Sequence, residues 1–109
     1  MRIEIKSTEL ILTPSLKEYI EKKFQPLSRF LKRYERAGEH VLFVEIARTT
    51  KHHKKGPVFY GEVTLSIEKK VFRAEVQSND VRVVVDQLKD ILREEIVQYK
   101  EKTSVQKRK

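Results

Sequence analysis

The chain has 109 residues, 39% of them hydrophobic and 37% charged, which suits one domain because a second core would need roughly 50 more. It contains no cysteine, so disulfides and thiolate metal sites are excluded, as expected of a cytoplasmic protein. With 24 Lys and Arg residues against 16 Asp and Glu, its formal net charge of +8 favours a polyanionic partner.

The N-terminal third of the chain predicts a strand followed by a long amphipathic helix. Residues 2–6 alternate polar and apolar side chains, which indicates a half-buried strand and not a signal peptide. Thr13 and Pro14 then form a helix start, with a hydroxyl that can cap free amides and a proline at the first helical position. Apolar residues, with Tyr19 and Phe30 among them, recur at helical spacing as far as Tyr34, which predicts a helix of about five turns. Because Pro26 lacks an amide hydrogen, we expect the helix to bend or break there.

The remainder of the chain predicts three strands and a final helix. After a loop with a glycine stop, alternating apolar residues predict strands at residues 41–50, 59–68 and 71–77. Lys69-Lys70 is expected to form the tight hairpin between the last two strands. The final helix is capped by residues 78–80 and keeps its apolar stripe as far as Tyr99. Because periodicity ends at Thr103, we place the domain at residues 1–102 and a basic flexible tail at 103–109.

The predicted order is therefore β-α-β-β-β-α, an α+β fold. Both helices carry one apolar stripe and each strand has one inward face, so we expect two helices side by side on one face of a four-stranded sheet. If the first two strands pair directly, the helical crossover makes them parallel, and the sheet is mixed. The outward sheet face carries several carboxylates and few aromatics, which argues against base stacking there. Phe43 and Tyr60 are either exposed contacts or, as we expect, partly buried.

Basic side chains gather along one border of each predicted helix. At about 100° per residue, four cations of the final helix fall within about 40° of one another, whereas its acidic residues lie at the edge of this group or turn away. Such cations can simply be solvated, with their stems covering the margin of the core. If the two borders face each other, however, they form a positive groove that suits phosphate binding. The candidate residues are Lys22, Lys23, Arg29 and Arg33 from the first helix and Arg82, Lys89, Arg93 and Lys100 from the last.

A second candidate RNA contact is the basic loop that begins at Arg48. This loop supplies Lys51, Lys54 and Lys55, which either contact RNA or form a solvated charge run. The adjacent histidines in the same loop have no acidic neighbour and are weak metal ligands, so we expect no metal site.

The sequence offers no catalytic motif. Its three glycines are isolated, and it has no Gly-x-Ser-x-Gly elbow, no His-Glu-x-x-His pair and no cysteine nucleophile. We therefore expect no enzyme, no cofactor and no small-molecule substrate. No apolar run approaches the ~20 residues that span a bilayer, so we expect no membrane-spanning segment. Membrane surfaces are anionic too, so net charge alone does not separate them from a nucleic acid; from the arrangement of the charges we expect no membrane partner.

Two segments carry a resemblance to a known family. Residues 13–24 (TPSLKEYIEKKF) resemble the Thr-Pro-x-Leu-x-x-Tyr-Val-x-x-Lys-Leu opening of the first helix in ribosome hibernation promoting factors and ribosome-associated translation inhibitors. Residues 80–90 (DVRVVVDQLKD) are similar to the family's Asp-Met-Tyr-x-Ala-Ile-Asp-x-Leu-x-Asp, and residues 72–75 are similar to the strand before it. The likeness runs in order from residue 1 to about residue 102.

The resemblance implies the same β-α-β-β-β-α fold and binding to the small ribosomal subunit. Basic helix residues would contact ribosomal RNA in the channel used by messenger and transfer RNA, and occupation would block translation in idle, stressed or stationary-phase cells. The chain looks like a short form without the second, dimerising domain, and we expect a monomer off the ribosome.

Departures from the family pattern affect the expected RNA contacts. Lys23 matches its family position, but Pro26 stands where lysine is frequent, and Arg82 stands where tyrosine is usual. The run at residues 91–96 lacks two usual cations, and the loop at residues 48–57 is longer than in the commonest form, so contacts are expected to shift toward that loop. Two alternatives remain open, a general double-stranded RNA-binding module and a protein-interaction regulator, the latter in keeping with an older label of the family as sigma-factor modulators.

Overall fold

The computed structural model describes residues 1–49 and 58–107, with the backbone alone described at 36, 37 and 104–107. Its element order confirms the predicted β-α-β-β-β-α fold, with two short 3-10 helices after the first α-helix. The elements are β1 (Arg2–Thr8), α1 (Pro14–Phe24), η1 (Gln25–Phe30), η2 (Lys32–Ala37), β2 (Val41–Arg48), β3 (Phe59–Ile67), β4 (Lys70–Ser78) and α2 (Val81–Lys107).

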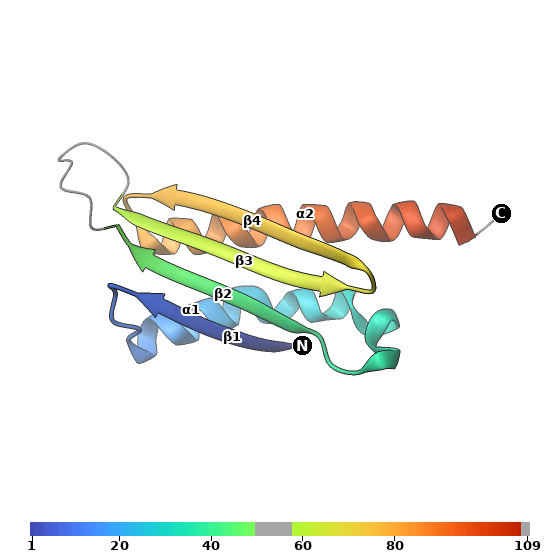
Figure 1. Cartoon of the computed structure of the whole chain (residues 1–109), viewed down its shortest axis with the longest axis horizontal. Coiled ribbons are helices and arrows are strands. Elements are labelled where there is room, and N and C mark those ends of the chain that lie inside the picture. The colour runs from blue at the N-terminus through green and yellow to red at the C-terminus, as the bar shows by residue number, and fades with distance from the viewer. Residues whose placement is uncertain (50–57, 108–109) are drawn as a thin grey trace.

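The four strands form one mixed sheet in the order β1-β2-β3-β4. Strands β1 and β2 are parallel, because α1, η1 and η2 carry the chain back between them, whereas β2–β3 and β3–β4 are antiparallel. Figure 1 shows both helices on the same side of the sheet, with α1 behind β1 and β2 and α2 behind β3 and β4. This is the arrangement that the apolar stripes predict, since each helix buries one face against the sheet.

The core lies between the sheet and the helices. Inward residues of the strands alternate with outward ones, as Val44, Val63 and Ala74 do at directly paired positions of β2, β3 and β4. Gly61 lies where α2 crosses β3: a Cβ built there would lie 2.8 Å from Leu88 Cδ1 and closer still to a methyl group of Val84. The absence of a side chain at Gly61 therefore lets α2 pack closely on the sheet. The residues buried in this core from the helices, and from the turn at Leu31 between η1 and η2, are Leu16, Ile20, Phe24, Leu27, Leu31, Val84, Val85, Leu88, Leu92 and Ile96.

The start and the end of α1 follow the sequence signals. The Thr13 hydroxyl accepts a hydrogen bond from the Leu16 amide at 3.1 Å, and Pro14 occupies the first helical position. The α-helix ends at Phe24, two residues before Pro26, and the chain continues as 3-10 helix. Because Pro26 has no N–H to donate, the α-helical ladder cannot continue through it, which confirms the predicted break.

The β3–β4 hairpin and helix α2 differ from expectation in their bounds. The hairpin turn consists of Glu68 and Lys69, with Lys70 already paired to Ile67, so the turn predicted at Lys69-Lys70 is wrong by one residue. Glu68 takes a left-handed backbone conformation (φ 56°). Helix α2 runs through residue 103 to Lys107, and its 27 residues give a length of about 40 Å. The backbone does not change at residue 102, and the proposed domain limit there stays a prediction.

The outer face of the sheet is uncovered by other elements of the described chain. Phe43 is 57% exposed there, so its predicted partial burial is wrong, whereas Tyr60 is half-buried as expected. Periodicity places Phe43 outward correctly, and its strand neighbours on this face are Glu4 and Thr64. Within the described ranges, neither helix combines the length and the apolar character needed to cross a membrane.

Candidate nucleic-acid interface

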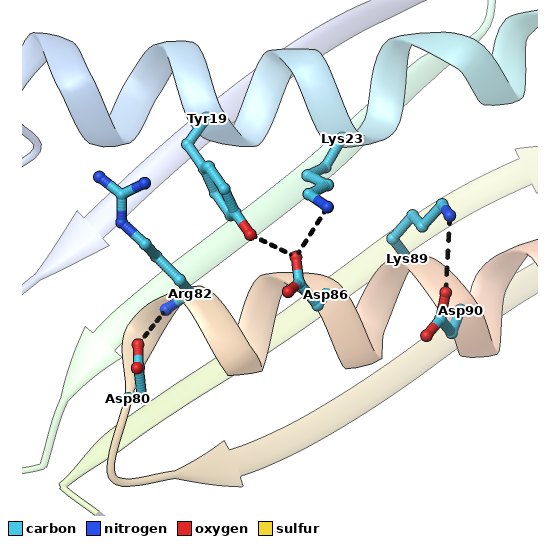
Figure 2. A network of polar contacts seen from close by, with 7 residues as sticks. All are labelled: Tyr19, Lys23, Asp80, Arg82, Asp86, Lys89 and Asp90. Carbon is cyan, nitrogen blue, oxygen red and sulfur yellow. Dashed lines mark hydrogen bonds and ion pairs between the residues drawn. The ribbon is translucent and has the colours of Figure 1, made fainter.

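The predicted basic borders of the two helical segments face each other along the seam between them. Figure 2 shows Lys23 extending from α1 toward α2, and Arg82 and Lys89 extending from α2 toward α1. We call this set of side chains the interhelical strip. It consists of Lys22, Lys23, Arg29, Arg33, Arg82, Lys89, Arg93 and Lys100.

At one end of the strip, the ring of Tyr19 brings cations of both helices together. The Arg82 guanidinium lies 4.6 Å from the ring centroid and the Lys23 ammonium lies 5.4 Å from it. The Tyr19 hydroxyl donates a hydrogen bond to Asp86 Oδ1 at 2.6 Å, and Lys23 Nζ lies 3.4 Å from the same oxygen (Figure 2). Arg82 also donates to the Ser15 hydroxyl at 3.3 Å. Two cations are thus held across the seam by one aromatic ring and one carboxylate.

Near the middle of the seam, the ring of Phe30 gathers three cations. Arg29 lies 4.9 Å from the ring centroid, Arg93 lies 5.7 Å from it and Lys100 lies 5.5 Å from it. Arg29 comes from η1 and the other two come from α2, so the cluster joins segments more than sixty residues apart in sequence. The negative face of an aromatic ring attracts cations without carrying a compensating charge. The three positive charges therefore remain available to an anion.

The far end of the strip is fixed by hydrogen bonds between η2 and α2. Arg33 lies 5.0 Å from the centroid of Tyr34 and donates to the Thr103 hydroxyl at 3.2 Å. The Tyr34 hydroxyl lies 3.3 Å from the same Thr103 oxygen, and its ring packs against Tyr99 with centroids 5.9 Å apart. This end of the strip is thus attached to the part of α2 that extends past the apolar stripe predicted from sequence.

The two remaining members of the strip lie along its length. Lys89 is half-buried between Arg82 and Arg93 on the same face of α2, and its ammonium lies 3.5 Å from Asp90 Oδ1. Lys22 is exposed, about one turn beyond Tyr19 on α1, and no described contact joins it to α2. The structure therefore brings seven of the eight predicted helical cations to the seam and leaves Lys22 at its margin.

The strip remains strongly positive after its internal pairings. The strip has eight cations, and two of them form ion pairs, Lys23 with Asp86 and Lys89 with Asp90. Both ion pairs are solvent-accessible, and such pairs are weak. The hydrogen bond to Asp86 raises the pKa of Tyr19 above its usual value of 10.0, and the Asp86 charge raises the pKa of Lys23 above 10.5. Both groups are therefore protonated at neutral pH, and Lys23 keeps its charge.

The role of two kinds of seam residue, the aromatic rings and one carboxylate, was not identified from the sequence. Tyr19 and Phe30 were assigned to the apolar stripe, yet both are half-buried rings that hold cations at the margin of the core. A signal for this was present, because Lys23 follows Tyr19 by one helical turn and Arg29 immediately precedes Phe30. The carboxylate is Asp86, which the sequence placed only at the edge of the basic stripe and which binds Lys23 and Tyr19 of α1.

Other predicted features lie outside the strip. Lys51, Lys54 and Lys55 fall outside the described residues, and their role stays a prediction. A hollow of about 520 Å³ lies on the other flank of α2, against β4, and is lined by Lys70, Tyr99 and Lys102 among others. Over residues 1–49 and 58–107, no group of three or more His, Asp or Glu side chains could hold a metal ion.

A sequence model of the family described as sigma 54 modulation protein / S30EA ribosomal protein matches residues 3–104. The chain belongs to this family. The match covers both segments that carry the resemblance to hibernation promoting factors, and it confirms that assignment. A search of curated proteins gave no match.

Solved structures of two proteins share the fold. The N-terminal domain of Protein Y from Thermus thermophilus is 21% identical, with a TM-score of 0.69 over 91% of this chain and 99% of that one. A protein described as a ribosomal subunit interface protein from Coxiella burnetii is 18% identical, with a TM-score of 0.71 over 93% of this chain and 99% of that one. At these identities the likeness shows the fold, and the function has to be argued from the residues.

Proposed function

We propose that this chain binds the small ribosomal subunit through the interhelical strip and so blocks translation in idle or stressed cells. In this proposal the strip contacts ribosomal RNA in the channel used by messenger and transfer RNA. The protein acts in the cytoplasm, as a monomer off the ribosome, and without catalysis or a cofactor. Family membership supports the proposal, as does the description of a similar fold as a ribosomal subunit interface protein.

The observation that carries the proposal is the convergence of cations from both helical segments on shared aromatic rings. A flexible exposed cation loses side-chain entropy when a ligand fixes its position, and a cation in an ion pair is already partly compensated. Here the rings of Tyr19 and Phe30 position five cations across the seam without neutralising them. A phosphate backbone approaching the seam would therefore meet ordered positive charges, which lowers the entropic cost of binding.

The strip also has a suitable length. From Arg82 to Lys100 it spans 19 residues of α2, and the 18 steps between them correspond to about 27 Å of helix. Several successive phosphates of one strand can be contacted over that distance. On the opposite, sheet face of the described residues, Arg2, Lys6 and Arg73 each lie 3.0–3.9 Å from a carboxylate, so that face presents no comparable row of cations.

Sedimentation of the full chain with purified small ribosomal subunits tests the proposal. We expect co-sedimentation at physiological salt, and we expect the triple reversal of Lys23, Lys89 and Arg93 to Glu to abolish it. The matched control reverses three exposed cations away from the seam, Arg2, Lys17 and Lys69, and should retain most of the binding. If the strip variant and the control variant bind equally well, the strip is not the contact surface.

The salt dependence of binding gives an independent measure of the contacts. Neutralising the same three strip residues to Gln should flatten the slope of log K against log salt by about two to three, since each lost phosphate contact contributes roughly 0.7–0.9. Equal affinity for bare duplex RNA and for small subunits would instead favour a general double-stranded RNA-binding module. Capture of a transcription component in place of ribosomal particles would favour a protein-interaction regulator.

A further inference from the structure

The open face of the sheet carries a row of carboxylates that the fold alone does not require. Glu45, Glu62 and Glu75 occupy directly paired positions on β2, β3 and β4, so three like charges lie side by side across the sheet. Directly opposed like charges destabilise a sheet. The chain as a whole has a net charge of +8, so a row of three adjacent carboxylates on one face differs in sign from the rest of the molecule.

Neighbouring groups compensate the row only in part. Lys6 Nζ lies 3.9 Å from Glu45, and Arg73 lies 3.5 Å from Glu62, whereas Glu75 is exposed at the β4 end of the row. The Tyr60 hydroxyl donates to Glu62 at 2.9 Å. Burial, this hydrogen bond and the charges of the row together raise the pKa of Tyr60 well above its usual value. Three carboxylates with two cations beside them leave the row with a net negative charge.

An exposed aromatic ring lies beside the carboxylates. Phe43 is 57% exposed and pairs with Glu4 on β1 and Thr64 on β3, in the row next to the three glutamates. A shallow hollow of about 360 Å³ adjoins the ring and is lined by Glu4, Glu45 and Glu62 together with Lys6; Glu4 pairs with Arg2 at 3.0 Å. The face therefore combines one apolar anchor with several acceptors of positive charge.

We propose that the open sheet face is a docking surface for a lysine- or arginine-rich protein segment. Charge complementarity selects this occupant: a nucleic acid would be repelled by the carboxylate row, whereas cationic side chains would pair with it. The long stems of Lys and Arg can also cover the Phe43 ring while their charged ends reach Glu62 and Glu75, and guanidinium groups stack on such rings. Because the helices cover the other face of the sheet, this surface and the interhelical strip can be occupied at the same time (Figure 1).

Fluorescence anisotropy with a short labelled peptide of alternating Arg and Gly tests this inference on the full chain. We expect saturable binding that weakens about tenfold in Phe43→Ala and about tenfold in the double variant Glu62→Gln, Glu75→Gln. The matched control, Glu94→Gln with Glu101→Gln on the exposed side of α2, makes the same charge change and should alter the affinity less than about twofold. Peptide-induced NMR shifts should map to β2 and β3.

Two results would overturn the inference. One is the absence of saturable binding to the unmodified chain, and the other is an equal loss of affinity in the control and the sheet variants. Thermal unfolding of each variant shows whether it is folded. The Phe43 variant and the Glu62, Glu75 double variant test the docking surface independently, so one result remains if the other variant does not fold. Because this titration contains neither RNA nor ribosomes, its failure leaves the proposed role of the interhelical strip unaffected.

Discussion

Replacing Phe30 by Leu tests whether an aromatic ring organises the middle of the strip. Leu keeps an apolar side chain against the core but removes the ring that Arg29, Arg93 and Lys100 approach at 4.9–5.7 Å. All cations of the strip remain present. The substitution therefore separates the positioning of the charges from their number.

The expected loss of stability can be worked from these three contacts. A solvent-accessible cation–π contact contributes about 0.5–1 kcal/mol, and three cations that repel one another on one ring contribute less than the simple sum. We expect about 1–2 kcal/mol from the contacts and less than about 1.5 kcal/mol from altered packing. For a domain of this size, each kcal/mol lowers Tm by about 4–8 °C.

A double-mutant cycle isolates the contact from the packing change. Urea unfolding of the parent chain, Phe30→Leu, Arg93→Met and the double variant should give a coupling energy of about 0.5–1 kcal/mol. The control cycle pairs Arg93→Met with Tyr19→Leu at the other end of the seam, and it should be additive within about 0.3–0.5 kcal/mol. Coupling between Phe30 and Arg93 no larger than this control would refute the anchoring role of the ring.

Three further predictions follow from the fold and the seam. Gly61→Ala should lower the free energy of unfolding by about 1–3 kcal/mol, because the added Cβ overlaps α2, and an unchanged melting curve would show that α2 can move away from the sheet. Thr13→Ala should cost about 1 kcal/mol through loss of the helix cap, and Thr13→Ser should restore it; equal melting temperatures for both would contradict the capping role. Asp86 raises the pKa of Tyr19, so the stabilisation from the Tyr19–Asp86 hydrogen bond is complete below pH 10 and is lost as pH rises through the raised pKa. Asp86→Asn should therefore lower the pKa of Tyr19 in an absorbance titration. It should also make the loss of stability at alkaline pH less steep.

Local patterns in the sequence predict most of the architecture. Period-two alternation locates the strands, period 3.6 locates the helices, and the amide missing from Pro26 explains why α1 ends at Phe24. The mixed sheet follows because a helical crossover leads to a parallel neighbour and a hairpin leads to an antiparallel one. The one-residue error at the β3–β4 hairpin arises because Glu68, a residue without β-turn preference, adopts a positive φ.

The composition of the seam was predictable and its geometry was not. Seven cations meet there because each helix is rotated about its own axis by long-range packing, for example where Gly61 admits α2 close to the sheet. Sequence periodicity defines one face on each helix, but it does not say which border of that face meets the neighbouring helix. For the same reason Tyr19 and Phe30 were assigned to the core and not to the margin where they hold cations.

A density map of the full chain bound to the small ribosomal subunit tests the central claim most directly. We predict that side chains of the interhelical strip, with Lys23, Arg82 and Arg93 among them, lie within about 3 Å of phosphate oxygens of ribosomal RNA. A complex in which the sheet face rests on RNA while the seam faces solvent would contradict the account.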